Sequence, residues 1–241
     1  MVDFNGKTYW LIGASEGLGR ALAHDLDKVG AKLVLSARSQ DRLNDLASDL
    51  TNARVVPIDV TDPEKVKLAV KQVGDIDGVV YIAGAYDPMS ATEWDGASAM
   101  LMCNVNFIGA MHVMGHVVPA MVAKGSGDIT LIGSLAGYRG LPKSIGYSAS
   151  KAALVSLAET LRFDLKDTGV LVRIVNPGFI KTRLTQKNSF KMPMLMTPEY
   201  AAQQVLKAMR RTRFRTEFPA PFSWGIRLLD YLPDVIVYRG K

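Results

Sequence analysis

Apolar runs of strand length alternate along the chain with longer segments in which apolar residues recur at helical spacing. Continuous apolar runs are typical of strands that are buried on both faces, and their alternation with helices is typical of repeated βαβ units. Six strands are predicted, at Thr8 to Ile12, Lys32 to Ala37, Arg54 to Ile58, Gly78 to Ile82, Ile129 to Gly133 and Leu171 to Val175. The pattern therefore predicts a doubly wound, Rossmann-type α/β fold, with a parallel sheet and helices on both of its faces.

Capping residues mark two helix starts. Thr61 is predicted to cap the helix after the third strand, because Pro63 falls in its first turn and Glu64 follows at the spacing of a capping box. Thr197 and Pro198 mark a second start in a similar way. These signals support the alternation of helices and strands independently of the apolar pattern.

Length and composition indicate one domain. A chain of 241 residues with 48% hydrophobic and 22% charged residues has the size of a single α/β domain, and no repeat or linker divides residues 1–241. Residues 183–196 lack a regular period and are rich in methionine, so we interpret them as a mobile substrate lid. Residues 212–241 form a C-terminal extension in which a last strand and a short helix are expected.

The remaining composition limits partners and compartment. No stretch approaches about 18 consecutive apolar residues and the N-terminus lacks a signal-peptide pattern, so a cytoplasmic protein is predicted and membrane contact is disfavoured. The net charge of +6 comes from scattered lysines and arginines, so no nucleic-acid partner is predicted. The one cysteine, Cys103, permits no intramolecular disulfide and lies in an apolar helical segment. His112 and His116 are four residues apart but have no convincing third ligand, so no metal is predicted.

A glycine-rich loop directly follows the first predicted strand and opens a helix from Leu18 to Val29. The loop reads Gly13-Ala14-Ser15-Glu16-Gly17-Leu18-Gly19. Free backbone N–H groups and the positive end of the helix dipole bind a pyrophosphate at such a position, and glycines let the backbone approach it closely. The G-x-x-x-G-x-G spacing differs from the broad dinucleotide fingerprint, so the loop alone leaves a structural role open.

The end of the second strand bears on the choice of nucleotide. An acidic residue there would bind the ribose 2′-hydroxyl of NAD, but this chain has Arg38, which suits a 2′-phosphate. Glu16 argues the other way, because its carboxylate would repel the same phosphate. NADP(H) is therefore the favoured cofactor, and NAD(H) stays open.

The candidate catalytic group follows the fifth strand. Ser134 comes first, and thirteen residues later Tyr147 and Lys151 open a long helix with both side chains on one face. A tyrosine with the ordinary pKa of about 10 carries protons poorly at neutral pH, and a nearby ammonium group would lower that pKa. The bare Tyr-x-x-x-Lys spacing is common, so the neighbouring motifs decide its meaning.

In this order, the glycine loop, Ser134, Tyr147 and Lys151 resemble the short-chain dehydrogenase/reductase family, from about Lys7 to Thr182. The resemblance implies that Asn106 is a fourth catalytic residue, holding a water linked to the lysine. It also implies cofactor contacts at Gly13, Ser15, Glu16, Gly17, Leu18, Gly19, Arg38, Asp59, Val60, Ala83, Gly84, Tyr147, Lys151, Pro177, Gly178, Ile180 and Thr182.

The implied reaction moves a hydride between the nicotinamide and a carbonyl or alcohol carbon. By this resemblance Ser134 and Tyr147 bind the substrate oxygen, Tyr147 gives or takes the proton, and Lys151 binds the ribose and lowers the tyrosine pKa. Three positions depart from the family's pattern, and we expect them to affect loop rigidity and affinity rather than chemistry. They are Ile12 in place of a threonine, Ile82 in place of an asparagine, and the acidic Glu16.

Substrate and partners are less constrained. An apolar carbonyl or alcohol is expected, because the lid carries Met192, Met194, Leu195 and Met196. A homodimer or homotetramer is expected, because residues 100–121 and 148–167 resemble the helices through which many family members associate.

Three alternatives stay open. One is reduction of a carrier-bound 3-oxoacyl thioester, with an acidic carrier facing Lys181, Arg183, Lys187, Lys191, Arg210, Arg211, Arg213 and Arg215. The second is an NADP(H)-binding sensor or scaffold without turnover, which the intact catalytic set disfavours. The third is membrane attachment through the apolar C-terminal residues, which instead are expected to pack on the domain or on a partner subunit.

Overall fold

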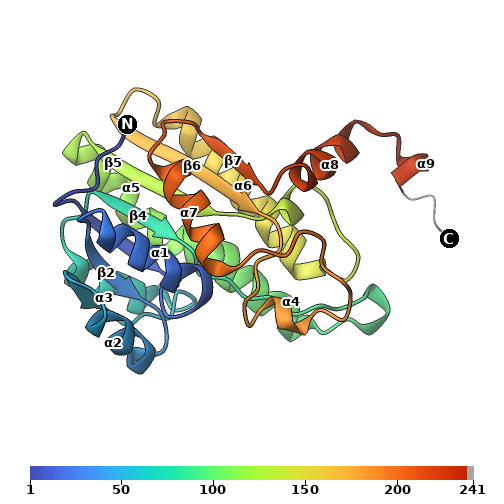
Figure 1. Ribbon diagram of the computed structural model, residues 1–241, viewed down its shortest axis with the longest axis horizontal. Coiled ribbons are helices and arrows are strands. Elements are labelled where there is room, and N and C mark those ends of the chain that lie inside the picture. Colours follow the sequence, from blue (N-terminus) through green and yellow to red (C-terminus); the bar gives the residue numbers. More distant parts are fainter. Residues whose placement is uncertain (238–241) are drawn as a thin grey trace.

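A computed structural model describes residues 1–237, with Asp230 described by its backbone alone, and contains one parallel sheet of seven strands (Figure 1). The strand order is β3-β2-β1-β4-β5-β6-β7, which confirms the predicted doubly wound fold. The strands are β1 (Thr8–Ile12), β2 (Lys32–Ser36), β3 (Ala53–Val55), β4 (Gly78–Tyr81), β5 (Gly127–Ile132), β6 (Val170–Pro177) and β7 (Arg215–Phe218). The order reverses between β1 and β4, so the loops after these strands flank the crevice at the carboxyl edge where such sheets bind ligands.

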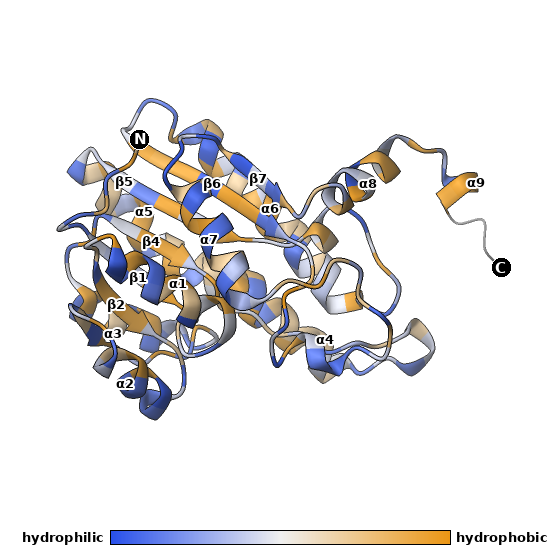
Figure 2. Ribbon diagram, in the orientation of Figure 1, coloured by the Kyte–Doolittle hydropathy of each residue, from blue (hydrophilic) through white to orange (hydrophobic). Residues whose placement is uncertain are grey.

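Helices cover both faces of the sheet (Figure 1). Apolar residues of α3 (Pro63–Val73), α5 (Gly109–Lys124) and α6 (Ile145–Asp164) form one core cluster with one face of the strands. Those of α1 (Gly17–Lys28), α2 (Gln40–Ser48) and α7 (Pro198–Met209) form a second cluster on the opposite face. Figure 2 shows hydrophobic residues concentrated along the strands between these two layers.

The predicted third strand is too long. β3 ends at Val55 rather than at Ile58. The chain nevertheless continues beside β2, since the N–H groups of Val56 and Ile58 donate to Leu35 and Ala37 at 3.0 Å each. Both side chains stay buried, which explains their apolar character.

The predicted cap of α3 is wrong by one residue. Asp62, not Thr61, is the N-cap, and its carboxylate accepts from the N–H groups of Glu64 and Lys65. Thr61 instead contacts Asp59, whose Oδ1 accepts from the threonine N–H at 3.0 Å and hydroxyl at 2.7 Å. The predicted start of α7 is confirmed, since the Thr197 hydroxyl accepts from the N–H of Tyr200.

The C-terminal extension contains the expected strand, β7, which pairs with β6. It continues into α8 (Phe222–Leu228) and the short α9 (Asp234–Val237), which extend away from the sheet (Figure 1). Ile226 packs into the protein, whereas Trp224, Leu228 and Tyr231 are exposed. The apolar residues of this extension thus divide between packing on the domain and facing outward.

One helical stretch, Gly96–Lys124, is long and apolar enough to cross a membrane by length and composition alone. It comprises α4 (Gly96–Cys103), a π-helical turn at Asn104–Ile108, and α5. Its inner face, including Val113, Val117 and Met121, belongs to the core that packs on the sheet. A buried core helix meets the same length and composition test.

Candidate active site

The four candidate catalytic residues come from three segments at or near the carboxyl edge of the sheet. Ser134 follows β5 and begins the 3-10 turn Leu135–Gly137. Tyr147 and Lys151 lie in the first two turns of α6, and Asn106 lies in the π-helical turn between α4 and α5. Such single-turn π bulges are frequent at functional sites.

The hydroxyl groups of Tyr147 and Ser134 interact in a hydrogen bond that acts to lower the pKa of the tyrosine. Burial outweighs this effect and raises the pKa of Tyr147 above its ordinary value. The prediction that Lys151 lowers the pKa of Tyr147 is wrong for this structure, in which the Nζ atom of Lys151 lies 5.8 Å from the centroid of the Tyr147 ring. Tyr147 is a protonated phenol at neutral pH in this arrangement.

Lys151 is buried, and its ammonium group makes a hydrogen bond to the protein backbone. Nζ donates to the carbonyl of Ile132, the last residue of β5, at 2.8 Å. Burial lowers the pKa of Lys151 to about 8. The lysine is thus held between the end of β5 and Tyr147.

Asn106 is fully buried and joins three segments. Its Nδ2 donates to the carbonyl of Ala85 at 3.0 Å and to Oγ of Ser150 at 2.9 Å, and its Oδ1 accepts from the N–H of Ala85 at 2.7 Å. The Ser150 hydroxyl also donates to the carbonyl of Tyr147 at 2.9 Å. Ser150 was missed as a site residue, although it lies one position before Lys151.

The glycine loop contacts two of the other segments predicted to bind the cofactor. A Cβ on Gly13 would lie 2.6 Å from the N atom of Ala83, and one on Gly17 would lie 2.9 Å from Cγ2 of Thr182. Both glycines also have positive φ angles, of 98° and 53°, which side chains rarely adopt. The loop, the Ala83-Gly84 turn and the segment after β6 therefore meet at one place.

The start of α1 fits an anionic ligand. Its N-cap residue, Glu16, makes no side-chain cap hydrogen bond, whereas α3, α4 and α7 are each capped by a side chain. The first N–H groups of α1 thus lack the internal acceptor that the other three helices have. This feature, with the glycine backbone, suits the pyrophosphate of a dinucleotide.

Ile12 and Ile82, the two isoleucines that depart from the family's pattern, take part in backbone hydrogen bonds beside the glycine loop. The carbonyl of Ile12 accepts from the N–H groups of both Ile82 and Ala83 at 2.8 Å. Ile12 is fully buried and Ile82 packs against the core, so hydrophobic contacts stand where polar side chains were expected.

The remaining residues predicted to contact the cofactor lie in the segment after β3 and at and after the end of β6. Val60 follows Asp59 in the segment after β3 and is buried. Its carbonyl oxygen lies 3.0 Å from Nδ1 of His112. After β6, the N–H of Gly178 donates to Phe218 at 2.8 Å. Pro177 is the last residue of β6, and Ile180 is buried. His112 is therefore engaged by backbone, and residues 1–237 contain no cluster of three groups suited to a metal.

The lid segment is irregular, as predicted, apart from a 3-10 turn at Thr185–Lys187. Met196 closes it by donating its N–H to Phe179 at 2.9 Å and accepting from Lys181 at 2.8 Å. Met196 is buried in the core, whereas Met194 and Leu195 are exposed.

Tyr86 was missed and lies between Tyr147 and the lid segment. Its ring packs edge-to-face on Tyr147 with centroids 5.0 Å apart, and its hydroxyl donates to Oδ1 of Asn188 at 2.7 Å. The next residue, Asp87, pairs with Lys187 at 3.1 Å. Two neighbouring residues therefore attach the lid beside Tyr147.

Glu16 does not present a bare negative charge. Its Oε2 pairs with Arg42 and its Oε1 with Arg183, each at 2.8 Å. Arg38 is exposed at the end of β2, and no ion pair of its side chain occurs within residues 1–237. Arg42 was missed, although it lies in the first turn of α2 just after Arg38.

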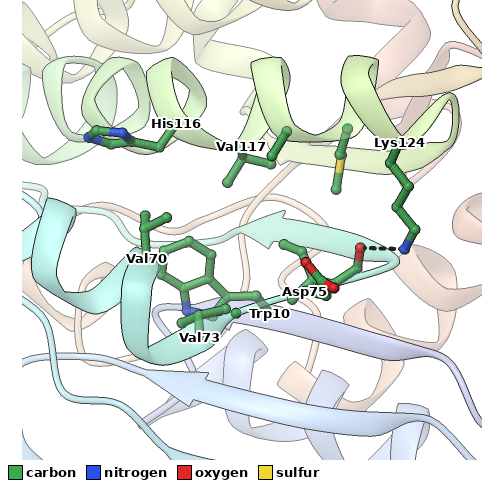
Figure 3. Close-up of a pocket in the computed structure, with 11 residues that line it drawn as sticks. Trp10, Val70, Val73, Asp75, His116, Val117 and Lys124 are labelled. Atoms are coloured by element: carbon green, nitrogen blue, oxygen red, sulfur yellow. Dashed lines mark hydrogen bonds between the residues drawn. The ribbon is translucent and has the colours of Figure 1, made fainter.

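A cavity of about 280 Å³ lies elsewhere (Figure 3). It is lined by Trp10, Val73, Ile76, His116 and Lys124, among others. The segment between α3 and β4 forms part of its wall, so the cavity lies at the amino edge of the sheet, opposite Ser134 and Tyr147.

Comparisons with known proteins agree with this geometry. Residues 7–192 match the family described as short chain dehydrogenase. A Myxococcus xanthus protein described as an "uncharacterized oxidoreductase" is 34% identical over 97% of this chain and 96% of its own length. A solved "short chain dehydrogenase/reductase family protein" superposes with a TM-score of 0.81 at 29% identity, covering 90% of this chain and 97% of that one. A short chain dehydrogenase from Burkholderia cenocepacia, solved in complex with NADP, gives a TM-score of 0.88 at 25% identity over 99% and 98% of the two chains.

Proposed function

Since this chain belongs to the short-chain dehydrogenase/reductase family of oxidoreductases, we propose that it moves a hydride between NADP(H) and a carbonyl or alcohol carbon. The observation that carries this proposal is the group formed by Ser134, Tyr147 and Lys151 at the carboxyl edge of the sheet. The Ala83-Gly84 turn links this part of the protein to the glycine loop. Ala83 lies against Gly13 of the loop that leads into the uncapped start of α1, and Ala85 is hydrogen-bonded to Asn106.

Each residue has a distinct task in this mechanism. A bound nicotinamide supplies or accepts the hydride. Ser134 and Tyr147 hold the substrate oxygen between their hydroxyl groups, and Tyr147 gives or takes the proton at its Oη atom. Lys151 binds the nucleotide ribose and supplies positive charge beside the phenol. Asn106 positions the Ala85 backbone and, through Ser150, the start of α6.

The protonation states are those that reduction requires. The phenol of Tyr147 is protonated at neutral pH, since burial raises its pKa. The pKa of Lys151, lowered to about 8, leaves its ammonium group mostly charged at pH 7. A donor phenol beside a cation suits protonation of the oxygen anion that forms when a carbonyl is reduced.

NADP(H) is proposed over NAD(H) because the end of β2 carries a cation. Arg38 is exposed there, and the carboxylate of Glu16 is already paired with two arginines. The repulsion expected from Glu16 is thereby offset. The NADP in the Burkholderia relative supports this choice by analogy.

The carrier-protein alternative loses support from the placement of its basic residues. Arg210, Arg211 and Arg213 precede β7 and so lie at the amino edge of the sheet, opposite the site. Lys187 and Arg215 are paired with Asp87 and Glu159. An acidic partner would therefore not meet one continuous basic surface. Small apolar carbonyl substrates and a cytoplasmic location remain part of our proposal.

The first experiment is a titration of the purified protein with NADPH and NADH, followed by energy transfer from tryptophan to nicotinamide. A panel of ketones, aldehydes and acyl thioesters is then added while nicotinamide absorbance is recorded. Tighter binding of NADPH and its consumption by a carbonyl compound is the expected result. Binding of neither nucleotide contradicts the proposal, and binding without turnover of any compound favours the sensor alternative.

A further inference from the structure

Glu16 is a bridging carboxylate between two segments that are far apart in the sequence. Its Oε2 atom pairs with Arg42 of α2 and its Oε1 atom pairs with Arg183, the first residue of the lid, each at 2.8 Å. The three side chains are partly exposed, with 39%, 45% and 61% of their surfaces accessible for Glu16, Arg42 and Arg183. The phosphate loop, the start of α2 and the lid are therefore joined by one polar group.

The charge of this group suits an anion. Two guanidinium groups and one carboxylate leave a net charge of +1, and the exposed Arg38 adds a further positive charge at the end of β2. In dinucleotide-binding folds this strand end recognises the 2′ position of the adenine ribose. Arg42 lies four residues beyond Arg38 in the sequence and thus at the same edge.

We propose that the Arg42–Glu16–Arg183 bridge is a specificity determinant that recognises the nucleotide 2′-phosphate through Arg42 and transmits its presence to the lid through Glu16. The inference rests on the proposed function, since it takes NADP(H) to be the ligand. Partly exposed ion pairs are weak, so a phosphate dianion competes effectively for Arg42. Glu16 then has only Arg183 as a partner and holds the lid more tightly, because a carboxylate shared by two cations is partly neutralised by each.

Binding by Arg42 is tested with two probes that differ only in the 2′-phosphate. Adenosine 2′,5′-bisphosphate and AMP are titrated calorimetrically into the wild type and into Arg42→Gln. The variant is expected to bind the bisphosphate at least about ten-fold more weakly, as loss of a hydrogen bond to a charged group implies, and AMP equally well. Arg20→Gln is the matched control, because Arg20 pairs with Asp45 and Asp49 at 2.7 and 2.9 Å and does not pair with Glu16.

Transmission to the lid is tested by hydrogen–deuterium exchange of residues 183–196, a readout that needs no turnover. The bisphosphate is expected to slow exchange more than AMP does in the wild type. In Glu16→Gln the bisphosphate still binds, more tightly because a negative charge is gone, but the difference between the two probes disappears. Arg42→Gln is expected to show slow lid exchange without ligand and no response to the bisphosphate.

The outcomes separate this inference from the proposed function. Undiminished bisphosphate binding by Arg42→Gln, or an unchanged lid response in Glu16→Gln, overturns the bridge and leaves the oxidoreductase proposal standing. Equal binding of both probes by the wild type also overturns the bridge, while NADH-dependent turnover would preserve the enzyme class. Binding of no adenine nucleotide by the wild type overturns both.

Discussion

At the scale of single residues, the hydroxyl of Tyr147, which is hydrogen-bonded to Ser134, is the group that we propose exchanges a proton with the substrate. Tyr147→Phe removes that hydroxyl and keeps the ring that packs on Tyr86. We expect kcat/KM to fall by about 10²- to 10⁴-fold, as is typical when a general acid is lost. NADPH affinity, measured by fluorescence titration, is the control and should hold. Turnover equal to that of the wild type would remove Tyr147 from the mechanism.

Arg38 is the residue on which nucleotide preference is predicted to depend most directly. Arg38→Asp replaces a phosphate partner with an acceptor for the ribose 2′-hydroxyl. NADPH should bind about ten- to a hundred-fold more weakly, and NADH more tightly. Arg213→Asp, an exposed arginine at the amino edge, controls for the change in total charge. An unchanged ratio of the two dissociation constants would assign Arg38 to the solvated surface.

Lys151 links site chemistry to stability. Its pKa is about 8 in the folded protein and 10.5 as an ordinary side chain, so between these values the unfolded chain binds more protons. The free energy of unfolding should therefore rise with pH across this window, by up to about 1.4 kcal/mol per pH unit from this group. Lys151→Met lacks the contribution, while all other titrations are shared. Urea unfolding of both proteins from pH 7.5 to 10 checks this, and a constant difference between them would contradict it.

At the scale of elements, the contact between β1 and α1 depends on Gly19. A Cβ there would lie 2.1 Å from the carbonyl oxygen of Gly13, so the helix would have to shift. Gly19→Ala should cost about 1–3 kcal/mol of stability and abolish nucleotide binding. Gly225→Ala in α8 meets no atom within 4 Å and should instead stabilise by about 0.5–1 kcal/mol. Urea midpoints and NADPH titration measure both effects, and similar results for the two variants would contradict this account.

Elements could be predicted from sequence wherever a local signal was strong. Each of the six apolar runs overlaps a strand of the sheet, and Thr197 caps α7 as expected. The errors arose where two neighbouring residues offer the same chemistry. Thr61 and Asp62 are both good caps, and the choice depends on where the chain turns after Asp59. β3 ends at Val55, yet Val56 and Ile58 beyond it are still buried.

The family's motifs could be found in the sequence, whereas contacts between distant residues could not. In the structure Tyr147 is hydrogen-bonded to Ser134 and lies near Lys151, and Asn106 contacts the same helix through Ser150. The partners of Glu16 lie 26 and 167 residues away, and no local pattern indicates that pairing. The direction of the Tyr147 pKa shift was also wrong, because spacing along a helix does not measure burial.

At the scale of the whole molecule, the surface retains apolar side chains on the helices that resemble the family's association surfaces. Met100 and Leu101 on α4, Met111 on α5 and Phe163 on α6 are exposed, Phe163 to 75%. Exposed apolar side chains of this size, grouped on neighbouring helices, are typical of interfaces between subunits. An isologous contact would bury the same face of two copies.

We therefore predict a homo-oligomer with a mass in solution at least twice the 26.2 kDa of the chain, measured by analytical ultracentrifugation. The double change Met111→Glu and Phe163→Glu should shift the mass toward that of one chain, because it places charges in the apolar contact. Leu68→Glu is the matched control, since Leu68 is exposed to 57% on α3, outside the helices concerned. A monomeric wild type would refute the prediction. An oligomer that survives the double change would place the contact on another surface, such as the exposed Trp224 and Leu228 of α8.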